Sequence, residues 1–153
     1  MNQDTIAIET KIIAPVEQVW KAWTDPSLVL RWFGSDPDGR GVKAQMDVRS
    51  GGKFEVTFAN SDGAQHTCYG VYAEVEESGR LTFSWTWKSE PGVESFVTVL
   101  LAADGAFTRT QFRHAGVGTK SAHNYLFGWQ SSFEKLEKVL TSATDHQSGG
   151  GQQ

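Results

Sequence analysis

The sequence has little of what secreted, disulfide-bonded and membrane proteins need. Cys68 is the one cysteine among 153 residues, so no disulfide can form within the chain. No apolar run approaches the ~20 residues of a membrane-spanning helix. The first ten residues, MNQDTIAIET, lack the basic start and the apolar core of a signal peptide. Because unpaired cysteine is the norm in a reducing compartment, we expect a cytoplasmic protein with no membrane span.

Positive charge is also scarce. The chain has 14 Lys and Arg against 18 Asp and Glu, a formal net charge of −4 and a pI near 5.5. The basic residues are scattered singly, whereas nucleic-acid binding depends on clustered Lys and Arg. We therefore expect no nucleic acid among the partners.

Motifs that would hold a metal or a cofactor are missing as well. No GxSxG, Walker-type or GxGxxG loop occurs. The histidines show neither i, i+4 spacing nor the cysteine partners of a zinc site, and they are His66, His114, His123 and His146. We expect no metal and no cofactor, and we assign no catalytic residue.

Cys68 and His66 alternate onto the same face of a predicted strand, which leaves a nucleophile–base pair open. The alternation places that face opposite the apolar one, so a structural thiol is the preferred interpretation. The clustered carboxylates lie in a loop and at strand ends, where solvated surface is expected; they are Asp36, Asp38, Glu74, Glu76 and Glu77.

What the sequence does have is aromatic rings, with six Trp and nine Phe. Its 39% hydrophobic and 21% charged residues are ordinary for a globular chain. We predict a single domain over residues 1–144 and a disordered tail over 145–153, which has nothing to bury. Tryptophan suits both a core and the wall of a binding site, so both interpretations stay open.

The N-terminal part predicts one strand and two short helices. Residues 5–12 alternate in hydrophobicity, as a half-buried strand does. Thr24 or Asp25 can cap the second helix, which begins with a proline and which Gly34 ends. The first helix starts at Pro15, and its apolar positions follow at helical spacing, namely Val16, Val19, Trp20 and Trp23.

Residues 42–114 predict six further strands. Turn formers separate runs of alternating hydrophobicity, and such short connections join antiparallel neighbours, so the strands form a meander. The alternation defines faces made, strand by strand, of Val42, Ala44, Met46 and Val48; Phe54, Val56 and Phe58; Thr67, Tyr69, Val71, Ala73 and Val75; Leu81, Phe83, Trp85 and Trp87; Val93, Ser95, Val97, Val99 and Leu101; Thr108, Thr110, Phe112 and His114.

A long helix is predicted from about Thr119 to about Thr144. Strands twist, so a sheet of about seven strands curls around such a helix. A curled sheet touches a straight helix well along only part of its length, and the remaining space is filled by large side chains or left as a pocket. The apolar stripe of the helix comprises Ala122, Tyr125, Leu126, Trp129, Phe133, Leu136 and Leu140.

Four segments carry a resemblance to a known family: APVEQVWKAWTDPSLVLRWFG, GGKFEVTF, YGVYAEVEESGRLTFSWTW and GWQSSFEKLEKVL. In this order and spacing they are similar to the activator of heat-shock-protein-90 ATPase homologue-like family of the START, or SRPBCC (polyketide-cyclase-like), superfamily. The resemblance covers about residues 5–141. It implies an α+β helix-grip fold, in which a curved antiparallel sheet wraps around a long C-terminal helix and two short helices follow the first strand.

The resemblance also implies an apolar cavity between the sheet and the long helix. In the superfamily such cavities hold lipids, hormones, polyketides or other hydrophobic molecules. A few members are enzymes, and the namesake activators, which are related to the stress response, work through protein contacts. A fold of this kind supports a pocket without naming its ligand.

Aromatic side chains of the predicted interior form the candidate ligand-binding site. Trp32 and Phe33 are candidates for a lid, and Gly128, which costs about 1 kcal/mol inside a helix, suggests room for a guest. His114 is the candidate polar anchor, although a partly solvated position at the strand end is the preferred interpretation. The candidate site residues are Trp32, Phe33, Phe54, Phe58, Trp85, Trp87, Phe112, His114, Tyr125 and Trp129.

Three functions stay open. The preferred one is non-catalytic binding of a small hydrophobic or aromatic molecule by a monomer or homodimer. The second is a protein-interaction module of co-chaperone type, which needs an exposed apolar patch, expected around Trp20, Trp23 and Trp32. The third is a cyclase- or hydrolase-like enzyme acting on an apolar substrate, for which His114 is the inward polar group on offer.

Overall fold

The computed structural model describes residues 5–34, 36–117 and 125–151, with side chains up to Thr141. Within these residues the order of elements agrees with the predicted α+β arrangement. The elements are β1 (Thr5–Ile12), α1 (Val16–Thr24), α2 (Pro26–Trp32), β2 (Arg40–Met46), β3 (Lys53–Ala59), β4 (Gln65–Glu76), β5 (Arg80–Trp87), β6 (Glu94–Asp104), β7 (Phe107–Ala115) and α3 (Tyr125–Gly151).

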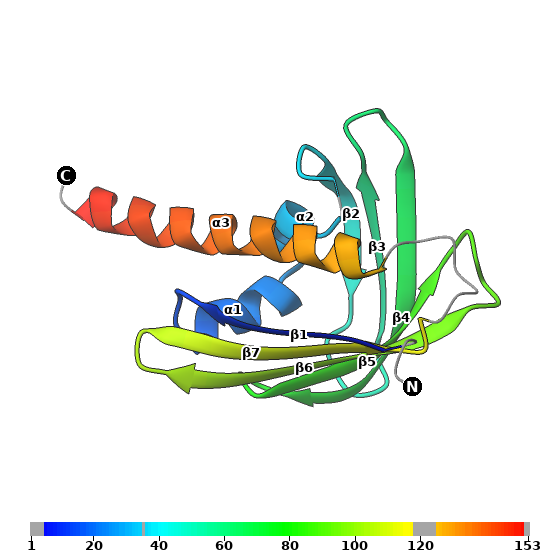
Figure 1. The fold of residues 1–153 in the computed structure, drawn as a ribbon, viewed down its shortest axis with the longest axis horizontal. Helices are drawn as coiled ribbons and strands as arrows, with labels where there is room; N and C mark the ends of the chain where they lie inside the picture. Colours follow the sequence, from blue (N-terminus) through cyan, green and yellow to red (C-terminus); the bar gives the residue numbers. More distant parts are fainter. Residues whose placement is uncertain (1–4, 35, 118–124, 152–153) are drawn as a thin grey trace.

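The strands form one antiparallel sheet in the order β1-β7-β6-β5-β4-β3-β2. From β2 to β7 each strand pairs with the next along the chain, which confirms the predicted meander. The sheet is strongly bent: β1, β7 and β6 run along α3, while β2, β3 and β4 rise steeply beside its N-terminal end (Figure 1). All three helices lie on the concave side, which confirms the predicted helix-grip fold.

The inner face of the sheet is the one predicted for β3, β5, β6 and β7. Its side chains are buried together with those of the helices in one continuous core. On the four strands the buried inner residues are Phe54, Val56 and Phe58; Leu81, Phe83, Trp85 and Trp87; Ser95, Val97, Val99 and Leu101; Thr108, Thr110, Phe112 and His114.

The face predicted for β4 is wrong over most of the strand. Cys68 and Tyr72 are buried, whereas Val71 is 41% exposed. The cause is a β-bulge: Tyr72 pairs with Phe83, but Glu74 pairs with Thr82, so one residue between them has no partner on β5. An extra residue reverses the alternation of side chains between the two faces. The prediction assumed strict alternation up to residue 75, so it assigned the residues before the bulge to the wrong face. A register shift in β2 likewise leaves Val42 outside, 44% exposed.

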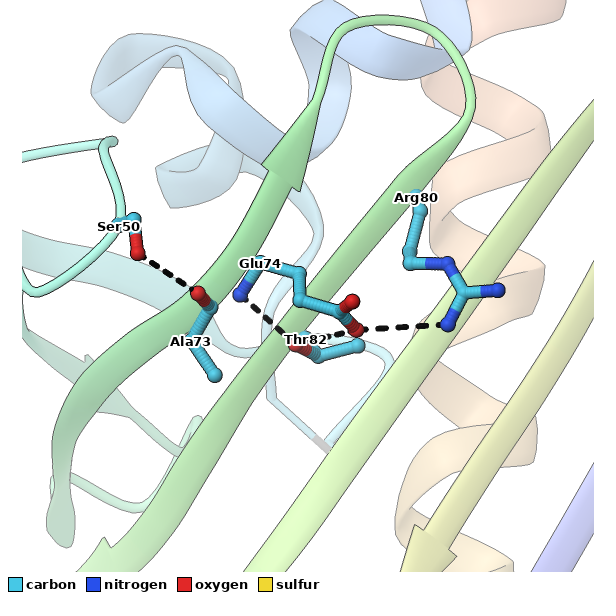
Figure 2. Close-up of polar contacts among 5 residues, drawn as sticks. All are labelled: Ser50, Ala73, Glu74, Arg80 and Thr82. Carbon is cyan, nitrogen blue, oxygen red and sulfur yellow. Dashed lines mark hydrogen bonds and ion pairs between the residues drawn. The ribbon is translucent and has the colours of Figure 1, made fainter.

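Side chains satisfy the backbone groups that the bulge in β4 frees from the ladder. Glu74 N donates to Thr82 Oγ1 at 2.9 Å, and Ser50 Oγ donates to Ala73 O at 2.9 Å (Figure 2). Arg80 contacts the Glu74 carboxylate at 3.3 Å beside them. Since an unpaired backbone group is costly, these contacts stabilise the irregular strand and the bend that it allows.

Helices α1 and α2 pack their tryptophans inward. Of the two predicted caps, Asp25 caps α2, because its Oδ1 accepts from Ser27 N at 2.9 Å. Trp32 is fully buried and donates from its indole N–H to Ala22 O at 2.8 Å. Trp20 and Trp23 are buried as well. The exposed patch predicted around these three residues is therefore wrong, and Trp32 belongs to the core rather than to a lid.

Helix α3 lies across the concave face, and its stripe from Trp129 to Leu140 is buried as predicted, whereas Leu126 is 45% exposed. The predicted start at Thr119 lies outside the described residues. The helical backbone continues to Gly151, beyond the predicted end at Thr144 and into the predicted tail. A helix that has formed gains one backbone hydrogen bond per added residue, without burial. The domain boundary at residue 144 stays a prediction.

Gly41 allows α2 to lie directly on β2. A Cβ atom at this position would come within 2.5 Å of Leu30 Cα and would also meet Leu30 O, both backbone atoms of α2. Backbone cannot move aside as a side chain can, so the close approach of these two elements requires glycine.

We expect Gly41→Ala to lower the free energy of unfolding by about 1 to 3 kcal/mol, as overpacking does. Urea unfolding followed by tryptophan fluorescence measures it. Gly92→Ala is the matched control, because a Cβ there has nothing within 4 Å and the change should stay within about 0.5 kcal/mol. Equal stabilities of the two variants would contradict this account of the α2–β2 contact.

Candidate ligand-binding pocket

A pocket of about 140 Å³ lies between the N-terminal part of α3 and strands β3, β4 and β5. It receives side chains from β3, β4, β5, α3 and the segment after α2. Seven of its lining residues are Phe, Trp or Tyr. The lining residues are Phe33, Gly34, Phe58, His66, Trp85, Trp87, Tyr125, Phe127, Gly128, Trp129 and Ser132.

Six of the ten predicted site residues line this pocket: Phe33, Phe58, Trp85, Trp87, Tyr125 and Trp129. The structure places the other four, Trp32, Phe54, Phe112 and His114, in the buried core outside the lining. Trp32 packs against Phe33 and Phe112 packs against Trp129, with ring centroids 4.6 and 4.5 Å apart, so both residues support the wall of the pocket from behind.

The site prediction did not include four of the lining residues, which are Gly34, His66, Phe127 and Ser132. A fifth, Gly128, was predicted only to leave room for a guest. His66 was missed because the alternation of β4 was assigned to the wrong face. Ser132 lies one helical turn after Gly128, and this i, i+4 spacing was an available signal. Phe127 is 58% exposed at the start of α3, and no pattern in the sequence distinguished it from a surface residue.

His114 is fully buried, so the predicted solvated position at the strand end is wrong. Trp129 Nε1 donates to His114 Nδ1 at 2.9 Å, and His114 Nε2 lies 2.6 Å from Ser95 Oγ. An indole N–H can only donate, so Nδ1 carries no proton, and the neutral ring donates from Nε2 to Ser95. The Ser95 hydroxyl then donates to Trp85 O at 3.3 Å.

This tautomer decides what chemistry the pair can perform. In a serine hydrolase the ring nitrogen that faces the hydroxyl is unprotonated and accepts its proton. Here the nitrogen that faces Ser95, Nε2 of His114, already carries a proton, because the other nitrogen, Nδ1, accepts the hydrogen bond from Trp129. Burial also lowers the pKa of His114 to about 3, so the ring is neutral at physiological pH. The Ser95–His114 pair is arranged to hold α3 to the sheet, and general-base activation of Ser95 is not available.

The segment after α2 closes one side of the pocket and is tied to α3. Ser132 Oγ donates to Gly34 O at 3.0 Å, and Lys135 Nζ donates to Asp36 O at 3.0 Å. Gly34 has φ of 115°, and a Cβ there would come within 2.9 Å of the Phe58 ring. Glycine is therefore needed both for the backbone conformation and for the space beside Phe58.

Charge is kept out of the lining. Among the described residues that line the pocket, no Asp, Glu, Lys or Arg is present. Lys135 is half-buried behind Gly34, where burial lowers the pKa of its ammonium. The Nε1 atom of Trp85 is buried and has no hydrogen-bond partner among the described residues. The described lining of the pocket thus consists mainly of aromatic rings.

The size of the pocket limits what can be enclosed. Drug-sized ligands occupy about 300–1,000 Å³, whereas about 150 Å³ holds a single benzene ring. At about 140 Å³ the pocket encloses one ring or a branched group of that size. Within the described residues there is no cluster of three or more His, Cys, Asp or Glu that could hold a metal ion, and no helix long and apolar enough to cross a membrane.

A bent seven-stranded antiparallel sheet that grips a C-terminal helix defines the class of helix-grip α+β domains. Residues 13–141 match the family described as Activator of Hsp90 ATPase homolog 1-like protein, and the chain belongs to this family. This confirms the resemblance predicted from the sequence. No curated protein matches the chain significantly.

Solved structures share the fold. Protein NE0264 from Nitrosomonas europaea is 21% identical, with a TM-score of 0.79 over 95% of this chain and 99% of that one. An AHSA1-like protein from Aeromonas hydrophila is 26% identical, with a TM-score of 0.76 over 92% and 94% of the two chains. CalU16 from Micromonospora echinospora is 27% identical, with a TM-score of 0.66 over 93% and 79%.

The buried His114 predicts how stability depends on pH. Its pKa in the folded chain, about 3, lies below the ordinary value of 6.5. Between these two pH values the unfolded chain binds a proton at His114 and the folded chain does not. The free energy of unfolding therefore falls as the pH drops from about 6.5 toward 3, by up to about 1.4 kcal/mol per pH unit. Hydrogen bonds from Ser27 and Ser61 lower the pKa values of Asp25 and Asp36. These two carboxyl groups therefore change the pH dependence of stability only below about pH 4.

Urea unfolding between pH 4 and 6.5 tests this, with His114→Phe as the comparison. The variant should be less stable at pH 7, because Trp129 loses its acceptor, but its stability should depend less on pH. The other histidines are common to both proteins and cancel. Parallel slopes would refute the assignment; if the variant does not fold, an NMR signal of His114 that titrates above pH 5 in the parent protein would do the same.

Proposed function

We propose that this protein binds a small hydrophobic or aromatic molecule, without catalysis, in the pocket between α3 and the sheet. The observation that carries the proposal is a space of about 140 Å³ walled by seven Phe, Trp and Tyr rings at the edge of one continuous hydrophobic core. Aromatic rings bury large apolar areas and provide stacking surface. Displacing water from such a wall by an apolar guest is favourable at roughly 25 cal/mol per Å².

The pocket favours a compact guest over a long one. One ring, or a branched group of similar size, fills the enclosed volume, so an extended lipid chain would project into solvent past Phe127.

The two alternative functions find less support. The apolar patch expected for a co-chaperone module around Trp20, Trp23 and Trp32 is buried. The enzyme acting on an apolar substrate was expected to use His114, and this residue lies outside the lining with its ring neutral. Cytoplasmic location and a monomeric or homodimeric state stay predictions from the sequence.

A thermal-shift screen against compact apolar and aromatic compounds tests the proposal. A ligand at about 100 times its Kd adds roughly 2.7 kcal/mol, which at this chain length raises Tm by about 5 to 10 °C. Gly128→Leu adds a side chain to a residue that lines the pocket, and we expect it to abolish the shift by filling the space.

Thr141→Leu is the matched control, because it adds a leucine to an exposed position of the same helix away from the pocket. It should keep the full ligand-induced shift. Leucine is also a better helix former than glycine by about 1 kcal/mol, so Gly128→Leu is expected to fold. A shift that persists in Gly128→Leu would place the ligand elsewhere, and a flat screen of the parent protein would refute the proposal.

A further inference from the structure

The rings of the pocket wall meet at steep angles. The interplanar angles are 89° for Trp85 with Trp87, 69° for Phe58 with Trp87 and 83° for Phe33 with Trp129. Between Phe33 and Trp85 the angle is 37°. These pairs have centroids 5.3 to 6.2 Å apart, so they are neighbouring walls in contact with one another. The described part of the wall therefore combines rings in several orientations and is not a slot between two parallel faces.

The shape of the wall distinguishes two kinds of guest. A flat aromatic ring is held best between roughly parallel faces, in offset stacking. A rounded group touches rings on several sides at once, and rings in several orientations suit it better. Among rounded groups, a quaternary or methylated ammonium gains a further attraction, because each ring face carries negative charge density, most of all in tryptophan. Three of the seven aromatic residues of the wall are Trp: Trp85, Trp87 and Trp129.

The charges around the pocket do not prevent a cation from binding. No Lys or Arg side chain belongs to the described lining. The ammonium of Lys135 lies behind Gly34, where it donates to Asp36 O and interacts with the Asp36 carboxylate, which offsets its charge. The whole chain has a formal net charge of −4, which favours the approach of a cation. Alkylated ammonium groups are less strongly hydrated than a primary ammonium, so they lose less hydration free energy on entering an apolar space, and the ring faces offset part of that loss.

We propose that the group recognised by this pocket is a compact alkylated ammonium, such as the trimethylammonium end of a choline-like molecule. The inference rests on the proposed function and narrows it, because it assigns the chemistry of the part of the ligand that the rings enclose. The angles of the wall, its three tryptophans, the absence of Lys and Arg from its described lining and its volume carry the inference together.

Choline and 3,3-dimethylbutan-1-ol are the probes, since they have nearly the same shape and the same hydroxyl but differ in charge. Titration of the full chain, followed by the NMR signals of the tryptophan indole N–H groups at constant ionic strength, measures both affinities. We expect choline to bind at least tenfold more tightly and to shift the signals of Trp85, Trp87 and Trp129. Equal or tighter binding of the neutral alcohol in the same pocket overturns the inference and leaves the proposed function standing.

The variant Phe127→Leu tests whether the cation is attracted to the aromatic ring, because leucine keeps the apolar contact and removes the ring. Phe127 lines the pocket but is largely exposed, so the variant should fold. One cation–π contact at an exposed site corresponds to about a two- to fivefold change in affinity, so choline should weaken by that factor and the alcohol by less than twofold. Leu126→Ala, outside the lining, should change neither. If Phe127→Leu weakens the binding of both probes equally, or if choline shifts no indole signals, the inference is overturned. The thermal-shift screen tests the proposed function independently of this result.

Discussion

A straight helix packed against a strongly bent sheet is the constraint on which the rest of the molecule depends. Around Leu136 and Leu140 the helix fits closely and its side chains are buried. Beside its N-terminal end β2, β3 and β4 turn out of the direction of the other strands and rise past the helix (Figure 1). The bulge in β4 and the contact of α2 with β2 at Gly41 support this bend. Space between the two surfaces is a consequence of the geometry, and large rings are the side chains that can partly fill it.

Trp129 joins the filled and the open parts of this interface. One side of the residue lines the pocket, and its indole N–H donates to the buried His114, which in turn reaches Ser95 on the neighbouring strand. Buried polar chains of this kind stabilise one arrangement only when every member has a partner. The chain of donors from Trp129 to the backbone of Trp85 meets that condition, so the wall of the pocket is held in a defined orientation. A rigid wall binds a guest with less loss of conformational freedom.

Membership of the family establishes the fold and leaves the function to the site, since one fold hosts many functions. The pocket of about 140 Å³ is bounded by seven aromatic side chains of the chain itself. Its volume, and not the family, is therefore the basis for the size of the guest that we propose. Hydrogen bonds from Lys135 and Ser132 hold the segment after α2, around Gly34 and Asp36, against α3. This segment closes one side of the pocket, so that side is held in place as well.

The sequence by itself determined the order of the elements, the antiparallel meander, the inner faces of β3 and β5–β7 and the buried stripe of α3. These features follow from periodicity and turn chemistry, which are properties of consecutive residues, and so six of the ten predicted site residues do line the pocket. Only the tertiary structure decided the face of β4, the burial of His114, and the entry of His66 and Phe127 into the pocket. Each of these depends on the register of a strand or the position of a helix against residues far away in the chain, and a single extra residue in a strand reverses what alternation predicts.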